Sequence, residues 1–289
     1  MRIAIFSAVY KEEIDAPLRQ TVNFLLHHGV DVLVERSFYS QIATKMKNFP
    51  TCTPIDAETL DADLVISIGG DGTFLTTAAR IGNRNIPILG INTGRLGFLA
   101  DVGNDEIDEI LQEILDGHYN VEERSVLQLT TSDLSSKNYP FALNEIAVLK
   151  QDLSSMISIR ASVNGEFLNT YQADGLLVAT PTGSTAYAMS VGGPLLVPQA
   201  QSLIIAPVAS HSLNVRPLII PDSWFIDLEI DSRSKSFLIS LDGRSQVMNQ
   251  TTTLHISKAD YTVKVVKPLH HSFFNTLKNK LMWGADKRN

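Results

Sequence analysis

The chain has 289 residues, of which 44% are hydrophobic and 19% are charged, and its formal net charge is −7. This length is a soft indication of about two domains, and the composition supplies enough apolar surface for full cores. The acidic balance argues against a nucleic-acid partner, which needs a basic face, so a small anionic ligand has to be held by a local pocket. Because Cys52 is the only cysteine and no signal segment or membrane-spanning run is found, we expect a cytoplasmic protein with no membrane contact.

The first 120 residues alternate between short apolar runs and apolar residues at helical spacing, which is typical of a parallel sheet covered by helices. Buried strands are predicted at residues 3–6, 64–68 and 86–91, with 30–34 as a fourth candidate. Helical periodicity at 14–26 stops at Gly29, and that at 107–115 stops at Gly117.

A glycine-rich motif, Gly69-Gly70-Asp71-Gly72-Thr73, directly follows the strand predicted at 64–68. Glycines let backbone N–H groups approach an oligophosphate, and a helix beginning at Thr73 would add its positive end. Asp71 would repel phosphates, so it more plausibly binds a metal ion or takes a proton from an attacking hydroxyl. The alternative is an ordinary turn in which Asp71 caps the helix, and this motif alone leaves both interpretations open.

Beyond residue 121 the apolar pattern changes to period two, which indicates a β-rich second domain. Residues 157–163 alternate and are followed by Asn164-Gly165, a strong signal for a tight hairpin with 166–171 as the returning strand. The same alternation predicts strands at 226–231, at 237–241 before the turn Asp242-Gly243, and at 261–266.

A polar segment follows the buried strand predicted at 176–179. The hydroxyl residues between Thr180 and Thr185, followed by Tyr187, suit hydrogen bonding to ribose and phosphate with an aromatic ring under a base. A long turn rich in Ser and Thr that caps a helix from Thr185 explains the segment equally well.

The end of the chain carries apolar residues at helical spacing between 273 and 283, which we expect to pack on the first domain or on a neighbouring subunit. The adjacent pairs His27-His28 and His270-His271 do not face one way on a helix or strand. We therefore expect no structural zinc and no metal site built from protein side chains alone.

The order and spacing of four motifs resemble the NAD kinase family. They are Gly-Gly-Asp-Gly-Thr at 69–73, Asn144-Glu145, Ala173-Asp174-Gly175 and Thr-Pro-Thr-Gly-Ser-Thr-Ala-Tyr at 180–187. The first is shared more loosely with diacylglycerol and sphingosine kinases and 6-phosphofructokinases, whereas the last is distinctive for NAD kinases.

The resemblance implies transfer of the γ-phosphoryl group of ATP to the 2′-hydroxyl of the adenosine ribose of NAD, giving NADP and ADP, with a divalent cation, usually magnesium. It implies a Rossmann-like α/β domain over 1–122, rejoined by a C-terminal helix at 269–289, and a β-sandwich domain that binds NAD over 123–268. The active site of this family lies in the cleft between the two domains, and its members commonly form homodimers or homotetramers.

The resemblance also assigns residues. Asp71 matches the carboxylate that acts as general base, Gly72 lines the phosphate site, and Asn144 with Glu145 holds the adenine and ribose portions of the dinucleotide. On sequence alone, Asn144 and Glu145 are equally well explained as polar interruptions of a strand, and Asp174, which matches the aspartate near the nicotinamide end, as a turn residue. The segment that wraps the dinucleotide and one weaker match complete the expected site: Thr185, Ala186, Tyr187, Ala188, Met189, Ser190 and Ala209.

Two positions depart from common family patterns: Gln172 replaces a basic residue, and Arg244 stands where glutamine is frequent. These changes leave the reaction type as expected but leave open the preference for NAD over NADH. His211 and Arg216 are excluded from the catalytic set, since a lone loop histidine is usually structural and Arg216 has an ion pair across the domain boundary as a simpler explanation. A lipid kinase of the diacylglycerol type and a non-catalytic dinucleotide sensor remain as alternatives; the polar segment at 180–190 and the acidic charge argue against the first.

Overall fold

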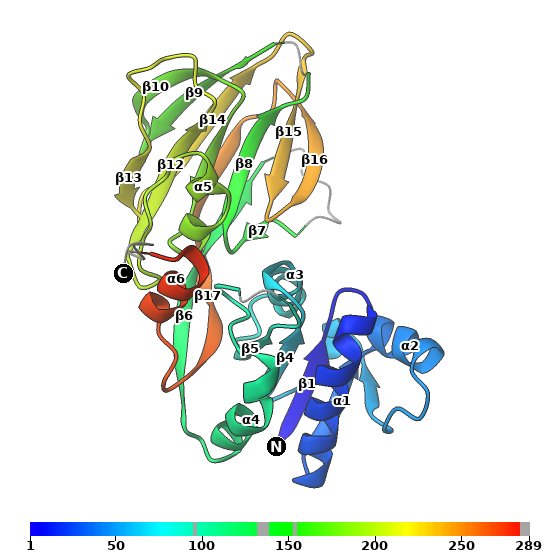
Figure 1. Ribbon diagram of the computed structural model, residues 1–289. Coiled ribbons are helices and arrows are strands. Elements are labelled where there is room, and N and C mark those ends of the chain that lie inside the picture. Colours follow the sequence, from blue (N-terminus) through cyan, green and yellow to red (C-terminus); the bar gives the residue numbers. More distant parts are fainter. Residues whose placement is uncertain (95–96, 132–138, 153–154, 284–289) are drawn as a thin grey trace. The chain divides into compact units, whose positions relative to one another are not determined.

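The computed structural model describes residues 1–94, 97–131, 139–152 and 155–283. The chain divides into two compact units, unit 1 (Met1–Glu123 with Val263–Asn289) and unit 2 (Arg124–Thr262) (Figure 1). The chain rejoins unit 1 at Val263, earlier than the expected residue 269, because the end of β17 (Leu254–Pro268) pairs with β5 (Ile88–Ile91) through Val265 and Ile88. Residues 284–289 of the expected C-terminal segment lie outside the described residues.

Unit 1 contains a parallel sheet in the order β17-β5-β4-β1-β2-β3. Its other strands are β1 (Arg2–Phe6), β2 (Asp31–Glu35), β3 (Thr53–Ile55) and β4 (Leu64–Ile68). The four buried strands expected in this region are confirmed, with small shifts at their ends. They form because short apolar runs rich in Ile, Val and Leu are stable as strands when both faces of the sheet are covered.

Helices cover both faces of this sheet. Packing on one face involves α1 (Glu12–His27), α2 (Arg36–Lys45) and α4 (Ile107–Leu115), whose apolar stripes share a core with Ile3, Ile5 and Ile66. On the opposite face lies α3 (Asp71–Ile81), where the hydroxyls of Ser67 and Thr77 are 3.1 Å apart. The short 3₁₀ turns are η1 (Ala57–Thr59) and η2 (Asn104–Glu106), and α6 (Phe273–Leu281) completes unit 1. Among the described residues, no helix combines the length and apolarity that crossing a membrane requires.

The position of β1 defines where a ligand would bind on this sheet. Strand β1 pairs with β2 on one side and with β4 on the other, and β4 pairs next with β5. The connection from β1 to β2 and the connection from β4 to β5 therefore run in opposite directions along the sheet. In open α/β sheets, ligands bind at such a switch point, outside the carboxyl ends of the strands. Gly69 and Gly70 lie at this edge, directly after β4.

Unit 2 consists of two antiparallel sheets. One sheet joins β10 (Glu166–Ala173), β9 (Ile157–Val163), β14 (Ile226–Asp231) and the Leu254–Ile256 part of β17, and in addition β6 (Tyr119–Thr130) pairs with β7 (Phe141–Ala142). The order of the other is β13-β12-β11-β8-β15-β16. Its strands are β8 (Glu145–Lys150), β11 (Gly175–Ala179), β12 (Ser202–Val208), β13 (Leu218–Pro221), β15 (Ser236–Leu241) and β16 (Arg244–Asn249).

Side chains from both sheets of unit 2 enter one apolar core. Ile159 and Ile226 come from the first sheet, and Val178, Ile205 and Ile239 from the second. This arrangement confirms the expected β-sandwich, and the hairpin at Asn164-Gly165 is formed as predicted, with positive φ angles of 50° and 78°. Between β11 and β12 the chain forms η3 (Thr182–Thr185) and the short helix α5 (Tyr187–Ser190).

Candidate functional site

A hollow of about 360 Å³ opens at the carboxyl edge of the sheet in unit 1. Its walls are segments that follow β1, β4 and β5 together with the start of α1: Ala8, Val9, Lys11, Glu13, Ile14, Gly69, Gly70, Thr73, Asn92, Thr93 and Gly94. Gly69 has a φ of 150°, and a Cβ atom there would overlap the Thr73 side chain. The glycine motif therefore leaves the backbone at the start of α3 uncovered by Cβ atoms, and the N–H groups and the helix dipole there favour an anion.

Asp71 does not cap the helix that it begins. The first helical residue of α3 is Asp71, two positions earlier than the expected Thr73, and no side chain caps the helix. Its carboxylate accepts backbone N–H groups from the loop after β5: Phe98 at 2.9 Å, Leu99 at 2.9 Å and Ala100 at 3.0 Å. The ammonium of Lys280 on α6 lies 3.4 Å from Oδ2.

Gly97 makes this arrangement sterically possible. A Cβ atom at Gly97 would overlap Oδ1 of Asp71 and the carbonyl oxygen of Ala100. Leu99 and Ala100 donate to Oδ1, and Phe98 and Lys280 to Oδ2, so the carboxylate has no free acceptor position. Lys280 is the most distant of these four donors and the one most easily exchanged for another. Asp71 in this state therefore does not fit the role of a protein ligand for Mg²⁺.

The C-terminal helix α6 packs within unit 1, which is one of the two arrangements expected from the sequence. Leu277 is buried, the Phe273 ring lies 6.3 Å from that of Phe98, and the Lys280 ammonium lies 4.6 Å from the centroid of the same Phe98 ring. Helix α6 therefore contacts both Asp71 and the loop that Asp71 holds.

In unit 2, a second carboxylate fixes the backbone around Asn144 and Glu145. Asp242, in the turn between β15 and β16, accepts N–H groups from Leu143 at 2.7 Å, Asn144 at 2.8 Å and Glu145 at 3.1 Å. The pKa of Asp242 is raised by burial, an effect that the three N–H donors and Arg244 oppose. Sequence reasoning identified Asp242-Gly243 only as a turn, because its partners lie about a hundred positions away in the chain.

Asn144 and Glu145 each present a buried oxygen without a protein partner. Asn144 is 8% exposed, and neither its Oδ1 nor Oε2 of Glu145 has a hydrogen-bond partner. The pKa of Glu145 is raised to about 7, first by burial and then by the Asp242 charge, while a hydrogen bond from the Tyr187 backbone opposes the rise. Buried acceptors without partners are costly, so these two atoms mark a place where a ligand can donate hydrogen bonds.

The Ser and Thr residues at 180–185 lie beside Asn144 and Glu145, but most of their hydroxyls donate hydrogen bonds to nearby backbone carbonyls. Thr180 donates to the Leu143 carbonyl, Ser184 to the Pro181 carbonyl and Thr185 to the Thr182 carbonyl. The turn interpretation thus accounts for these three hydroxyls, and they shape the loop instead of facing outward. Tyr187 is 36% exposed, so its ring is available to a ligand, whereas Ala188 is fully buried.

Two further expected residues, Asp174 and Ala209, lie together at the ends of β11 and β12. The Asp174 N–H donates to the Val208 carbonyl at 2.9 Å, and its carboxylate pairs with Lys150 at 2.7 Å. Ala209 adopts a φ of 45°, a strained conformation for a residue with a Cβ atom and one that is enriched at functional sites.

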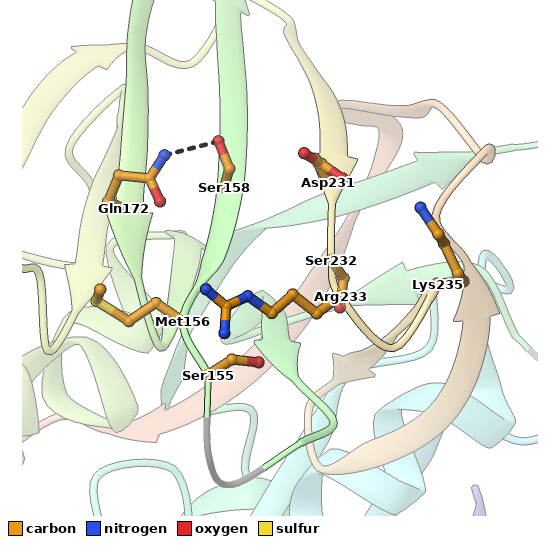
Figure 2. A pocket seen from close by; sticks show the side chains of 8 residues that line it. All are labelled: Ser155, Met156, Ser158, Gln172, Asp231, Ser232, Arg233 and Lys235. Carbon is orange, nitrogen blue, oxygen red and sulfur yellow. Dashed lines mark hydrogen bonds between the residues drawn. The ribbon is translucent and has the colours of Figure 1, made fainter.

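Gln172 and Arg244, which depart from common family patterns, and Arg216, which was excluded from the catalytic set, all form hydrogen bonds with nearby residues. Gln172 donates to Ser158 at 3.0 Å in a hollow of about 530 Å³ that also contains Arg233 and Lys235 (Figure 2). Arg244 donates to the carbonyls of Tyr139 and Phe141. Arg216 donates to the carbonyls of Leu213 and Val215 of its own loop.

Comparisons with known proteins agree over the whole chain. Residues 3–119 match the ATP-NAD kinase N-terminal domain, and residues 143–268 match the ATP-NAD kinase C-terminal domain. The chain is 54% identical over 289 residues to the NAD kinase of Bacteroides fragilis (strain YCH46), with all of both chains covered. It is 44% identical over 288 residues to the NAD kinase of Porphyromonas gingivalis (strain ATCC BAA-308 / W83), with 99% of each covered.

Solved structures show the same fold. Yeast NADH kinase complexed with NADH superposes with a TM-score of 0.89 at 23% identity, covering 99% of this chain and 88% of the other. The NAD kinase from Archaeoglobus fulgidus in complex with ATP has a TM-score of 0.77 at 26% identity, covering 98% and 99%. By its motifs, its fold and its full-length relatives, this chain belongs to the NAD kinase family.

Proposed function

We propose that this protein transfers the γ-phosphoryl group of ATP to the 2′-hydroxyl of the adenosine ribose of NAD, giving NADP and ADP. The observation that carries the proposal is the pair of buried acceptors without partners, Oδ1 of Asn144 and Oε2 of Glu145. NAD offers matching donors in its adenine amino group and its ribose hydroxyls, and the partly exposed Tyr187 ring offers a surface for the adenine.

We assign phosphate binding to the hollow behind β4 in unit 1. The bare backbone at Gly69 and Gly70, Gly72 in the first turn of α3 and the helix dipole all favour an oligophosphate at this edge. The wall of the same hollow carries one positive and one negative side chain, Lys11 and Glu13, so the backbone N–H groups and the helix dipole carry the preference for an anion.

Asp71 is the proposed general base. Its three backbone donors hold the carboxylate in one position, from which an oxygen can accept a proton. The 2′-hydroxyl replaces Lys280 as the fourth partner and gives its proton to Asp71. Its oxygen forms the new bond to the γ-phosphorus, and the bond from that phosphorus to the bridging oxygen breaks, so that ADP leaves with the bond electrons. A positioned base is worth roughly 10²–10⁴ in rate.

Magnesium is proposed to arrive with ATP, coordinated by phosphate oxygens and water, because the acceptor positions of Asp71 are occupied. When bound, it would neutralise charge on the phosphates. We also propose a cytoplasmic location, since the single Cys52 has no disulfide partner, and assembly as a homodimer or homotetramer by analogy with the family.

The test replaces Asp71 with Asn. In an assay coupled to ADP release, Asp71→Asn is expected to lower turnover at least about 10²-fold while calorimetry still detects NAD binding. Asp61→Asn, at an exposed position of the same unit, is the matched control and should retain full turnover. Near-normal turnover of Asp71→Asn would refute its assigned role.

The same assay separates the alternative functions. A dinucleotide sensor would bind NAD without releasing ADP, and a lipid kinase would use diacylglycerol in vesicles in place of NAD. Measuring NAD and NADH against ATP and inorganic polyphosphate, with magnesium present or chelated, identifies the donor, the acceptor and the metal requirement together.

A further inference from the structure

Three side chains with metal-binding atoms, none of them part of the glycine motif or of the Asp71 contacts described above, meet in unit 1. Glu106 lies at the end of η2, and His270 and His271 lie in the turn between β17 and α6. Their ligand atoms all lie within 4.8 Å of one another. This grouping is not visible as a spacing pattern in the sequence, because Glu106 precedes His271 by 165 positions.

The closest pair already has the spacing of two metal ligands. Nε2 of His271 lies 3.3 Å from Oε1 of Glu106. Two atoms bound tetrahedrally to zinc at about 2.0–2.1 Å are about 3.3–3.4 Å apart. The other Glu106 oxygen accepts the Gly103 N–H at 2.9 Å, which orients the carboxylate and leaves Oε1 directed at His271.

Carboxylates also lie behind both imidazoles. Oδ2 of the buried Asp101 is 3.6 Å from Nδ1 of His271, and Oε1 of Glu113 is 3.8 Å from Nδ1 of His270. The second oxygen of Glu113 is buried and has no hydrogen-bond partner. A carboxylate facing the second ring nitrogen is the arrangement that orients histidines bound to a metal.

The local charge balance favours a cation. Asp101, Glu106 and Glu113 bring three carboxylates to the two histidines, and the ammonium of Lys267 lies 2.6 Å from one of them, Asp101. With neutral imidazoles, this leaves an excess of negative charge.

We propose that Glu106, His270 and His271 bind a divalent transition-metal ion, Zn²⁺, with water in the fourth position. Two imidazoles and one carboxylate form a ligand set that suits zinc, whereas magnesium prefers oxygen ligands alone. His270 is half exposed, so its ring can turn to close the site. The site is therefore separate from any magnesium that accompanies ATP.

The proposed site holds the beginning of α6. His271 immediately precedes Ser272, whose hydroxyl caps this helix, and the same helix carries Lys280 to Asp71. A bound metal would connect η2 to the beginning of α6 and stabilise unit 1 against unfolding, because Glu106 meets the two histidines only in the folded chain.

Calorimetric titration with ZnCl₂ at about pH 7.5, on protein stripped with a chelator, tests the proposal. We expect one Zn²⁺ per chain, binding unaffected by excess MgCl₂, and a rise in Tm of at least about 5 °C at a hundredfold excess over Kd. Asp71→Asn should bind Zn²⁺ as the wild type does, which separates this result from the fate of the proposed kinase mechanism.

The variants His270→Ala and His27→Ala form a matched pair, since each removes one member of an adjacent histidine pair. His270→Ala and Glu106→Gln should weaken Zn²⁺ binding at least about tenfold, and His27→Ala should leave it unchanged. The proposal is overturned if stoichiometric binding is absent, if MgCl₂ displaces the zinc, or if the two histidine variants bind alike.

Discussion

The carboxylates of Asp71 and Asp242 have the same pattern of hydrogen-bond donors. Each carboxylate accepts N–H groups from three consecutive residues of a distant loop, 98–100 for Asp71 and 143–145 for Asp242. Hydrogen bonds to an ionised group contribute about 1.5–3 kcal/mol each, so one side chain fixes a whole turn of backbone. At the residue scale, each of these two carboxylates holds a backbone segment of the candidate site in place.

Asp242→Asn tests this role in unit 2. An amide has one acceptor oxygen, so at least one N–H of the 143–145 backbone loses its partner and Asn144 is held less firmly. We expect the KM for NAD to rise at least about tenfold with a smaller change in kcat, and the free energy of unfolding to fall by about 1–3 kcal/mol. Asp231→Asn, on an exposed strand end of the same unit, is the control. An unchanged KM in Asp242→Asn would contradict the positioning role.

Glu145 gives unit 2 a specific pH dependence. Its pKa is raised to about 7 from the ordinary 4.5, so the folded protein holds this proton more tightly than the unfolded chain does. Its contribution to stability is complete below about pH 4.5 and is lost as the pH rises to about 7, by about 3 kcal/mol at most.

Glu145→Gln removes this contribution. The difference in free energy of unfolding between wild type and variant, measured by urea denaturation from pH 4 to 8, should change across that window and be flat above it. A difference that is constant over the whole range would show that the carboxyl does not titrate in this way.

At the scale of elements, the turn at 97–100 is shaped by its contact with the start of α3. Gly97→Ala places a methyl group against Asp71 and the Ala100 carbonyl, which are both fixed. We expect a loss of about 1–3 kcal/mol in the free energy of unfolding, together with a fall in turnover. Gly94→Ala is the matched control for stability, because a Cβ atom there meets nothing within 4 Å. Equal stabilities of the two variants in thermal denaturation would contradict the packing described for Gly97.

Regular elements with strong local patterns were predictable, and irregular ones were not. The strand β4, the helix α4 and the β9–β10 hairpin follow directly from apolar periodicity and the Asn-Gly turn. By contrast, α2 and β16 were missed because their sequences are mostly polar, with two buried side chains in α2 and one in β16. These elements form because neighbouring strands and core residues hold them, which local propensity does not encode.

At the scale of the whole molecule, a net charge of −7 does not attract anionic substrates at long range. Added salt should therefore not weaken the binding of NAD as it weakens the binding of anions to a basic protein. We expect kcat/KM for NAD to change less than about threefold between about 50 and 300 mM NaCl. A steep loss with salt, measured in the ADP-coupled assay, would instead show that a positive field guides the substrates.

The sequence by itself determined the family, the two fold classes and the candidate residues, because glycine motifs, turn dipeptides and apolar periodicity are local signals. The tertiary structure alone decided which groups those residues meet. It placed Lys280 beside Asp71, Asp242 beneath Asn144 and Glu106 next to His271. The physical reason is that hydrogen bonds and ion pairs form between groups close in space, and in each of these pairs the fold joins positions about a hundred or more apart in the chain.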